Sequence, residues 1–558
     1  MMLFTLRSQL CGCTMLLASA AWAQGPMVSS LAPARHAPAA ARNANVQLTL
    51  SQPAAATAAL HVFSSRSGGK KAGTSTVAGN TVTFDPSSDF KPGETLTATL
   101  TNAGGPMHTW QFTAAVGGGT GVFGGGSDFN FQNNYTAINI LPGDFDNDND
   151  LDAMVVAQQS GAALLINNGA GQFTRSSAGI PNTNYPTETA VGDIDGDGDL
   201  DVVSSPSRPY AITVARNNGN LNFVSAAALS INPISTEINS LTLADIDGDA
   251  DLDLCHLNPV AKQITIWPND GTGNFGPART TATNLANTVA MRLGDVDNDG
   301  DLDALVYNRV SGEAMHVFLN DGSANFTAGS SFPISSYDAH TSLADIDGDG
   351  DLDLASGDYG MLPQAHLYLN NGSGTFTAGQ VVPISGSPRQ IAFGDVDADG
   401  DLDMIISANQ TISLSLNAGN GTFTAGPITP ISSRCVALAD VNGDSALDLL
   451  TVSLNGNNHE VFNTRLNTLI TSSKSSARAA FQVWPNPVGA GAALHITLPT
   501  AAPVATYSLQ TLLGHTIRQQ QFSGRNTTVS PEGLASGVYV LKVQVPGQPL
   551  AAQRIVVN

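Results

Sequence analysis

Short apolar runs that alternate with polar residues, separated by turn residues, occupy most of the chain. The alternation is clear near the N-terminus in NVQLTL (45–50) and NTVTFDP (80–86). Further along, an Asn/Gly-rich segment that ends in Phe, such as NNGAGQF, follows an apolar run at 167–173, 217–223, 269–275, 320–326, 370–376 and 417–423. Asn-Gly and Asp-Gly between apolar runs are strong hairpin signals. The pattern predicts an all-β protein.

A second segment repeats in step with the first and is rich in Asp, as in GDIDGDGDLD (192–201). Its seven copies are spaced by 49, 52, 50, 50, 50 and 45 residues, and their first Asp residues are Asp144, Asp193, Asp245, Asp295, Asp345, Asp395 and Asp440. Each unit of about fifty residues therefore contains four predicted strands, with the Asp loop between the first two. Four strands per repeat are typical of a propeller blade. We predict a seven-bladed β-propeller over residues 128–470.

The last unit indicates how the predicted ring closes. It has an Asp loop (440–448) but no Asn/Gly segment after it, whereas GGGSDFNF (124–131) precedes the first loop and resembles the missing outer strand. We predict that this N-terminal strand completes the last blade, which leaves no sheet edge open at the join. The alternative is an open solenoid with two capping repeats.

The Asp loops have the composition of a hard-cation site. Counted from the first Asp, positions 1, 3, 5 and 9 offer side-chain oxygens and position 7 a backbone carbonyl, a set that suits calcium better than magnesium. None of these positions is His or Cys, which argues against zinc or copper. An EF-hand would need Glu at position 12 and flanking helices, and neither is present or predicted. Solvated acidic turns without metal remain the alternative.

Up to seven calcium ions are therefore predicted, with the weakest binding at 440–448, where Asn replaces one carboxylate. Gly stands at position 6 in the second, fourth, fifth and sixth loops, where a tight turn favours positive φ; Asn149, Ala250 and Ser445 replace it elsewhere. The candidate ligands are Asp144, Asp146, Asp148, Asp150 and Asp152; Asp193, Asp195, Asp197, Asp199 and Asp201; Asp245, Asp247, Asp249, Asp251 and Asp253; Asp295, Asp297, Asp299, Asp301 and Asp303; Asp345, Asp347, Asp349, Asp351 and Asp353; Asp395, Asp397, Asp399, Asp401 and Asp403; and Asp440, Asn442, Asp444, Ala446 and Asp448.

Charge and targeting signals narrow the class of protein. The formal net charge is −23, and the Asp loops hold 33 of the 46 acidic residues. This acidity argues against nucleic acid as a partner. Arg7, a short apolar core and Ala21-Trp22-Ala23 predict a secretory signal peptide over residues 1–23. No run of about 18 apolar residues predicts a transmembrane segment.

At the Asp loops the chain resembles the FG-GAP/VCBS repeat family, which includes the heads of integrin α-subunits. The resemblance implies calcium bound in hairpin loops on one face of a propeller. Residues 42–116 resemble a bacterial Ig-like domain, and GGGTGVFGGG introduces a predicted flexible linker over 117–127. After a second linker (471–479), VWPNP, LLGHTI and LASGVYVLKV within 480–558 resemble the type A C-terminal sorting domain of the type IX secretion system, a small β-sandwich. That resemblance implies a Gram-negative source, the type IX secretion machinery as a partner, and a secreted or surface-attached protein.

Two classes of function fit these observations. The first is a calcium-stabilised binding or adhesion protein, expected as a monomer, that recognises a glycan or an extracellular protein. The alternative is a carbohydrate-active propeller enzyme with paired carboxylates near the axis, although no catalytic motif is found and no enzyme is expected. A ligand face is predicted at the ends of the first strands opposite the Asp loops, formed by Tyr185, Glu188, Glu237, Tyr337, Asp338, His340, Arg389 and Arg434.

Overall fold

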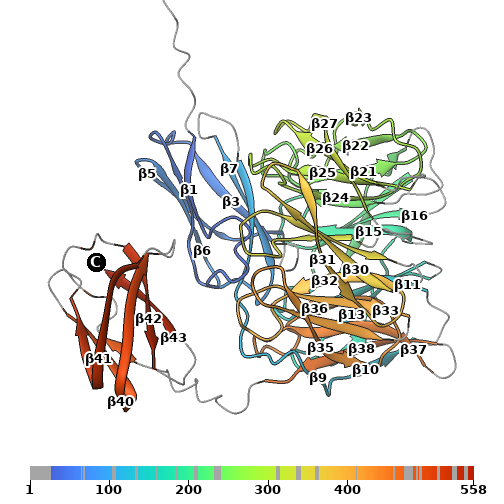
Figure 1. The fold of residues 1–558 in the computed structure, drawn as a ribbon. Coiled ribbons are helices and arrows are strands. Elements are labelled where there is room, and N and C mark those ends of the chain that lie inside the picture. Colours follow the sequence, from blue (N-terminus) through green and yellow to red (C-terminus); the bar gives the residue numbers. More distant parts are fainter. Residues whose placement is uncertain are drawn as a thin grey trace, which may run out of the picture. The chain divides into compact units, whose positions relative to one another are not determined.

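The computed structural model describes the chain from residue 27 to residue 557 apart from several short segments, and every described regular element is a strand (Figure 1). The segments outside the description are 65, 67–68, 103–107, 132–135, 159, 182, 184–185, 207–210, 232–239, 310–313, 335–340, 359–362, 410, 456–458, 470–481, 485–487, 489–492, 512–515, 531–533, 535–536 and 546–550. The predicted all-β fold is confirmed. The predicted signal peptide (1–23) and the linker at 471–479 lie outside the described residues.

The N-terminal domain is a sandwich of two sheets that share one apolar core. One sheet has the order β1-β2-β6-β5, and its strands are β1 (Val28–Ala32), β2 (Val46–Leu50), β6 (Thr81–Pro86) and β5 (Gly73–Ala78). The other has the order β4-β3-β7-β8, and its strands are β4 (Gly69–Lys70), β3 (Ala59–Ser64), β7 (Thr95–Thr101) and β8 (His108–Thr113). The sandwich begins ahead of the predicted start at residue 42, because β1 pairs with β2.

The alternation seen in the sequence builds this core. In β2 the apolar residues Val46, Leu48 and Leu50 are buried, whereas Gln47 between them is exposed. Side chains on a strand point alternately to opposite faces, so a period of two places one apolar row inside. Trp110 on β8 fills the centre and is 1 % exposed.

Seven further sheets each contain one Asp loop between their first and second strands. The first strands are β11 (Ala137–Gly143), β15 (Pro186–Gly192), β20 (Leu241–Ala244), β24 (Thr288–Gly294), β28 (Thr341–Ala344), β32 (Pro388–Gly394) and β36 (Ser433–Ala439). The second strands are β12 (Asp152–Ala157), β16 (Asp201–Pro206), β21 (Asp253–Asn258), β25 (Asp303–Asn308), β29 (Asp353–Asp358), β33 (Asp403–Ala408) and β37 (Asp448–Leu454).

The outer half of each of the first six blades is a hairpin around the Asn/Gly segment, and in the last blade β10 takes the place of the fourth strand. The third strands are β13 (Gly161–Asn167), β17 (Ala211–Asn217), β22 (Gln263–Trp267), β26 (Ala314–Asn320), β30 (Gln364–Asn370), β34 (Ile412–Asn417) and β38 (Glu460–Asn467). The fourth strands are β14 (Phe173–Arg175), β18 (Phe223–Ser225), β23 (Arg279–Ala282), β27 (Phe326–Pro333), β31 (Phe376–Pro383), β35 (Phe423–Thr429) and β10 (Asp128–Asn130). In addition, β19 (Leu229–Ser230) pairs with β17.

The second strand of a blade is buried on both faces. All six residues of β12, with the sequence DAMVVA, are buried, and the same holds for β25 and β33. A strand covered on both sides needs a continuous apolar run rather than an alternating one. The blades therefore pack face to face around the axis, as in a propeller.

The ring closes as the sequence predicts. β10 pairs with β38, so the last sheet has the order β10-β38-β37-β36 and combines one N-terminal strand with three C-terminal ones. Phe129 on β10 and the adjacent Phe131 pack with Phe462 of β38 in one apolar cluster. The open solenoid is therefore excluded.

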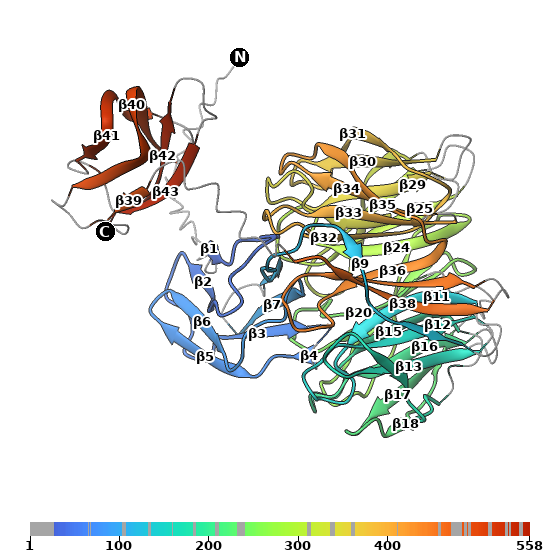
Figure 2. The same ribbon diagram turned by 90° about the horizontal axis from the view of Figure 1, so that it is seen from below.

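The predicted linker at 117–127 is not a free joint. β9 (Phe123–Gly124) pairs with the end of β38, as Figure 2 shows by placing the two strands side by side. The Gly121 N–H donates to the Val396 carbonyl at 3.0 Å, and the Thr120 N–H donates to Asn467 Oδ1 at 3.1 Å. Its glycines allow the chain to lie close against the blades, which corrects the prediction of flexibility.

Residues 470–558 form a separate compact unit. Its described strands form one connected sheet of the order β39-β40-β42-β43, with β41 also paired to β40. They are β39 (Gln482–Trp484), β40 (Leu494–Thr511), β41 (Thr516–Val529), β42 (Gly537–Gln544) and β43 (Ala551–Val557). The start of β40 pairs with β39 and its end with β42, so both halves of this long strand contribute to one core.

Candidate metal centre

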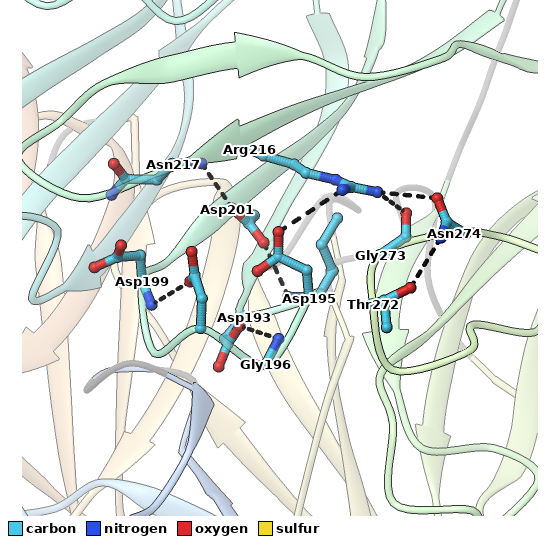
Figure 3. Close-up of polar contacts among 12 residues, drawn as sticks. Asp193, Asp195, Gly196, Asp199, Asp201, Arg216, Asn217, Thr272, Gly273 and Asn274 are labelled. Carbon is cyan, nitrogen blue, oxygen red and sulfur yellow. Dashed lines mark hydrogen bonds and ion pairs between the residues drawn. The ribbon is translucent and has the colours of Figure 1, made fainter.

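Each Asp loop is held in shape by hydrogen bonds from its own backbone, as the second loop shows (Figure 3). Asp193 at position 1 accepts the Gly196 N–H at 2.8 Å on Oδ1 and the Gly198 N–H at 3.1 Å on Oδ2. Asp197 accepts the Asp199 N–H at 3.0 Å. These bonds curl the loop around its carboxylates and keep the like charges close together.

Position 6 has a left-handed backbone in every loop. Its φ is 93° at Gly198, and φ values of 78°, 72° and 73° occur where Asn149, Ala250 and Ser445 replace glycine. The expectation of positive φ at this position is confirmed. A residue with a Cβ is disfavoured in this conformation, so the three replacements need a compensating contact.

The Asp at position 9 is a structural residue as well as a candidate ligand. Asp201 is fully buried; its Oδ2 accepts the Ile194 N–H at 3.0 Å and its Oδ1 accepts the Asn217 N–H at 2.7 Å. The same pair of bonds occurs at Asp152, Asp253, Asp303, Asp353, Asp403 and Asp448. This carboxylate ties the loop to the end of the third strand, a role that the sequence pattern did not reveal.

The loops have the donor set and the charge that a cation requires. Ligand oxygens of Asp144, Asp146 and Asp152 lie within 4.8 Å of one another, and similar clusters occur in the second to fifth loops. Oδ1 of Asp245 is buried and has no hydrogen-bond donor among the described residues. Burial raises the pKa of Asp245 to about 7 and that of Asp201 to about 8. A buried cation would offset this cost of keeping them ionised, so the residues present fit a bound ion.

The seventh loop departs from this arrangement. The Asn442 side-chain amide donates to Asp444 Oδ2 at 2.9 Å, so part of the carboxylate at position 5 is already engaged within the loop. Ala446 at position 7 is buried. The prediction that this loop binds calcium most weakly stays in place.

Two arginines that the sequence analysis did not single out approach position 3 of their loops. Arg216 lies 3.8 Å from Asp195 and donates to the Gly273 carbonyl (Figure 3), and Arg279 lies 3.3 Å from Asp247. Each comes from the outer half of its own blade. They partly neutralise carboxylates at the loop surface.

The Asn that ends each third strand joins neighbouring blades. The Asn217 side-chain amide donates to the Phe145 carbonyl, at position 2 of the preceding Asp loop, at 3.0 Å. Asn269, Asn320, Asn370, Asn417 and Asn467 repeat this bond, and Asn167 closes the ring by donating to the Val441 carbonyl at 2.8 Å. The sequence analysis used this Asn only as a hairpin signal.

The N-terminal sandwich contacts the Asp loops directly. Arg35 lies 3.0 Å from Asp295 Oδ2, and Lys91 Nζ donates to Asn149 Oδ1 at 2.7 Å. Arg42 Nη1 donates to the Ser445 hydroxyl at 3.0 Å. Asn149 and Ser445 are two of the three residues that replace glycine at position 6, and the third, Ala250, is 3 % exposed. At two of the three loops that lack this glycine, the sandwich therefore contacts the replacing residue itself.

The described residues of the predicted ligand face lie at the strand ends away from the Asp loops, on β15, β32 and β36. Burial raises the pKa of Glu188 to about 7, and the charge of Arg292 lowers it. Arg434 forms an ion pair with Glu460 at 3.1 Å, a partner that the sequence analysis missed. Arg389 is half-buried on β32. Tyr185, Glu237, Tyr337, Asp338 and His340 lie outside the described residues.

Comparison with protein families agrees with this geometry. The FG-GAP-like repeat family matches residues 144–204, 193–256, 258–306, 345–406 and 395–451, and these segments contain all seven Asp loops. The chain is an FG-GAP repeat protein. Repeats of this kind usually bind calcium, and the Asp clusters of this FG-GAP protein have the oxygen atoms to hold ions.

Two further families match the flanking units of this FG-GAP repeat protein. The bacterial Ig-like domain family matches residues 23–114, and the secretion system C-terminal sorting domain matches residues 482–558. The sorting domain indicates export by type IX secretion to the cell surface or the extracellular space, so the secretion machinery is a partner. In the described part of the chain, no helix is long and apolar enough to cross a membrane.

Several solved structures are similar to this FG-GAP repeat protein. One, described as an Agrocybe aegerita lectin recognising terminal N-acetylglucosamine, is 22 % identical, with a TM-score of 0.40 over 71 % of this chain and 93 % of that chain. PorZ, a surface component of the type IX secretion system of Porphyromonas gingivalis, is 14 % identical, with a TM-score of 0.39 over 93 % of this chain and 73 % of that chain. A search of curated proteins finds no match.

Proposed function

We propose that this FG-GAP repeat protein is a calcium-stabilised binding or adhesion protein that recognises a glycan or an extracellular protein. The observation that carries the proposal is the repeated cluster of buried and half-buried carboxylates, such as Asp245, Asp247 and Asp253, whose ligand oxygens lie within 4.8 Å of one another. Calcium accepts six to eight oxygens in flexible geometry, so it suits such loops. The ions would stiffen the blades and hold a recognition surface in place.

The ligand would bind at the end of the propeller away from the Asp loops. The Asp loops already contact the N-terminal sandwich through Arg35, Lys91 and Arg42. At the opposite strand ends, Arg389 on β32 forms no ion pair with another described residue, and Arg434 is about a third exposed. Cationic side chains at this end suit an anionic glycan or an acidic protein surface.

We propose binding rather than catalysis. The alternative, a carbohydrate-active enzyme, relied on Glu188 and Glu237 as a carboxylate pair, and Glu237 lies outside the described residues. Among the described residues, the charge that acts on Glu188 is that of the Arg292 guanidinium. No described feature favours the alternative.

Calorimetry tests the calcium part of the proposal. Titration of the metal-free protein should show calcium uptake at several sites, with magnesium a poor substitute. Each independent site adds about 2.7 kcal/mol at a hundredfold excess over Kd, so chelation should lower the Tm steeply. Asp197→Asn should reduce the calcium-dependent stabilisation more than Asp444→Asn, because the seventh loop is already depleted. No calcium uptake would return the loops to solvated acidic turns.

A glycan array and binding to extracellular proteins, each with and without calcium, test the recognition part. Arg389→Ala combined with Arg434→Ala should abolish binding of the ligand found. Arg389→Ala alone should weaken binding without lowering calcium-loaded stability, whereas Arg434 also pairs with the buried Glu460 and its loss lowers stability as well. Arg175→Ala, on an outer strand, is the matched control for loss of a surface cation. Full affinity in the double variant would place the ligand elsewhere, for example on the N-terminal sandwich.

A further inference from the structure

A pair of threonines from the N-terminal sandwich fits between the third and fourth Asp loops. Thr99 on β7 and Thr109 on β8 lie opposite each other in the sheet, and their hydroxyls are 3.1 Å apart. Thr99 Oγ1 donates to Asp245 Oδ2 at 2.8 Å, and the Thr109 N–H donates to the Gly300 carbonyl at 2.7 Å. Thr99 is fully buried and Thr109 is 4 % exposed. The contact is a buried polar one between the sandwich and the propeller.

The direction of the hydroxyl protons follows from the chemistry of the acceptor. An ionised carboxylate only accepts, so the Thr99 proton must point to Asp245. A hydroxyl has one proton, and Thr109 must therefore donate its own to Thr99. The two threonines form a short donor chain that ends on the carboxylate at position 1 of the third loop.

The two oxygens of Asp245 have different partners. Oδ2 accepts the Ala250 N–H at 3.1 Å as well as the Thr99 hydroxyl. Oδ1 is buried without a donor among the described residues, and Asp245 belongs to the cluster formed with Asp247 and Asp253. Thr99 thus fixes the Asp245 carboxylate through Oδ2, and Oδ1 stays available to an ion.

We propose that Thr99 is an outer-shell positioning residue for the cation site of the third loop, so that the N-terminal sandwich completes a metal centre of the propeller. The inference rests on the proposed calcium binding and deepens it. Partners that orient a metal-ligating side chain typically change metal affinity by 10–100-fold when they are removed. A buried hydroxyl bonded to a carboxylate is well suited to this task, because it orients the ligand without adding a competing charge.

Coupling between the two domains follows from this placement. If docking of the sandwich strengthens ion binding at the third loop, the bound ion must strengthen docking by the same factor. Removing calcium should therefore loosen the hydrogen bond from the Thr109 N–H to Gly300, which lies beside the hydroxyl contact. The strength of sandwich docking would then depend on whether the third loop holds an ion.

Hydrogen exchange followed by mass spectrometry can test this inference loop by loop in the full chain. Exchange in the peptide that contains residues 245–253 is measured as calcium is added, and the sixth loop (395–403) is the internal reference. Thr99→Val should raise the calcium midpoint of the third loop about tenfold or more and leave the sixth loop unchanged. Thr99→Ser, which keeps the hydroxyl, should restore the midpoint.

Thr97→Val is the matched control, because Thr97 lies on the same strand and its hydroxyl accepts from Gln111 rather than contacting a loop. It should leave every midpoint unchanged. If Thr99→Val folds poorly, Thr109→Val should still shift the third loop in the same direction. An unchanged third-loop midpoint in Thr99→Val, or an equal shift in both loops, would overturn the inference. Absence of any calcium response in the unmodified chain would instead overturn the proposed function.

Discussion

At the scale of the residue, the carboxylates of one loop have different duties. Asp353 at position 9 is fully buried and accepts the Ile346 N–H at 3.0 Å and the Asn370 N–H at 2.8 Å. Asp349 at position 5 is exposed and accepts only within its loop, from the Asp351 N–H at 2.9 Å among the described residues. The first residue serves the fold with or without an ion, whereas the second matters once an ion is bound.

Asp353→Asn should therefore destabilise the protein by about 1–3 kcal/mol even in excess chelator. The amide of Asn would place its own NH2 group opposite one of the two backbone N–H groups that Asp353 accepts. That buried N–H would then have no acceptor. Asp349→Asn, the matched control, should lower the Tm with calcium present and have little effect in chelator. Urea unfolding of both variants in the two conditions checks this, and equal behaviour of the two variants would contradict the division of roles.

A second residue prediction concerns a buried histidine. His256 on β21 is fully buried, neither ring nitrogen has a hydrogen-bond partner among the described residues, and burial lowers its pKa from 6.5 to about 4. Below pH 6.5 the unfolded chain takes up a proton on His256 that the folded chain does not. The free energy of unfolding therefore decreases as the pH is lowered from 6.5 towards 4. At pH 5 this costs about 2 kcal/mol.

His256→Val should remove that loss, because valine occupies the equivalent position in other blades at Val155 and Val306, both fully buried. The variant should melt above the unmodified protein at pH 5, with a smaller difference at pH 7.5. Melting of both proteins at the two pH values is the measurement. A difference in Tm that does not grow on acidification would show that His256 is protonated in the folded state.

At the scale of the element, one short strand decides whether the ring closes. β10 has only three residues in register with β38, but Phe129 and the adjacent Phe131 join the cluster around Phe462. Without them the edge of β38 would face solvent. Exposed strand edges pair with other chains, so the loss should favour aggregation.

Two N-terminal truncations separate this strand from the sandwich. A chain that starts at Gly117 loses the sandwich and keeps β9 and β10, whereas one that starts at Thr136 loses all of them. The first should not aggregate and should melt cooperatively with calcium, and the second should aggregate or melt at a far lower temperature. Size-exclusion chromatography and calorimetry distinguish them, and equal stability would mean that β10 is dispensable for closure.

At the scale of the whole molecule, the export signal and the propeller lie in separate compact units. The chain divides into two compact units at Leu469, and the second coincides with the sorting domain that the family comparison matches at 482–558. A chain that ends at Leu469 should keep the calcium-loaded Tm of the first unit, because each unit has an apolar core of its own. It should also be retained inside the cell envelope instead of reaching the surface. Cell fractionation checks this, and normal surface display would show that the tail is not the address.

The sequence by itself determined the repeat, the number of Asp loops, the all-β class and the closing strand. These are carried by local patterns, namely alternation of apolar residues, turn dipeptides and a period of about fifty residues. The sorting domain was also recognisable from short motifs near the C-terminus. Local signals are sufficient here because each blade repeats one hairpin design.

Only the tertiary structure decided which groups meet across long separations. The bond from Asn167 to Val441, the ion pair of Arg35 with Asp295 and the hydroxyl contact of Thr99 with Asp245 join residues more than a hundred positions apart. Their residue types are common at solvated turns, so nothing in the local pattern distinguishes them. The replacement of glycine at position 6 was visible in the sequence, but the contacts that the sandwich makes with Asn149 and Ser445 were not. Docking of the sandwich on the propeller depends on the shapes of two folded surfaces. No local sequence pattern encodes such a fit, so it could not be predicted from the sequence.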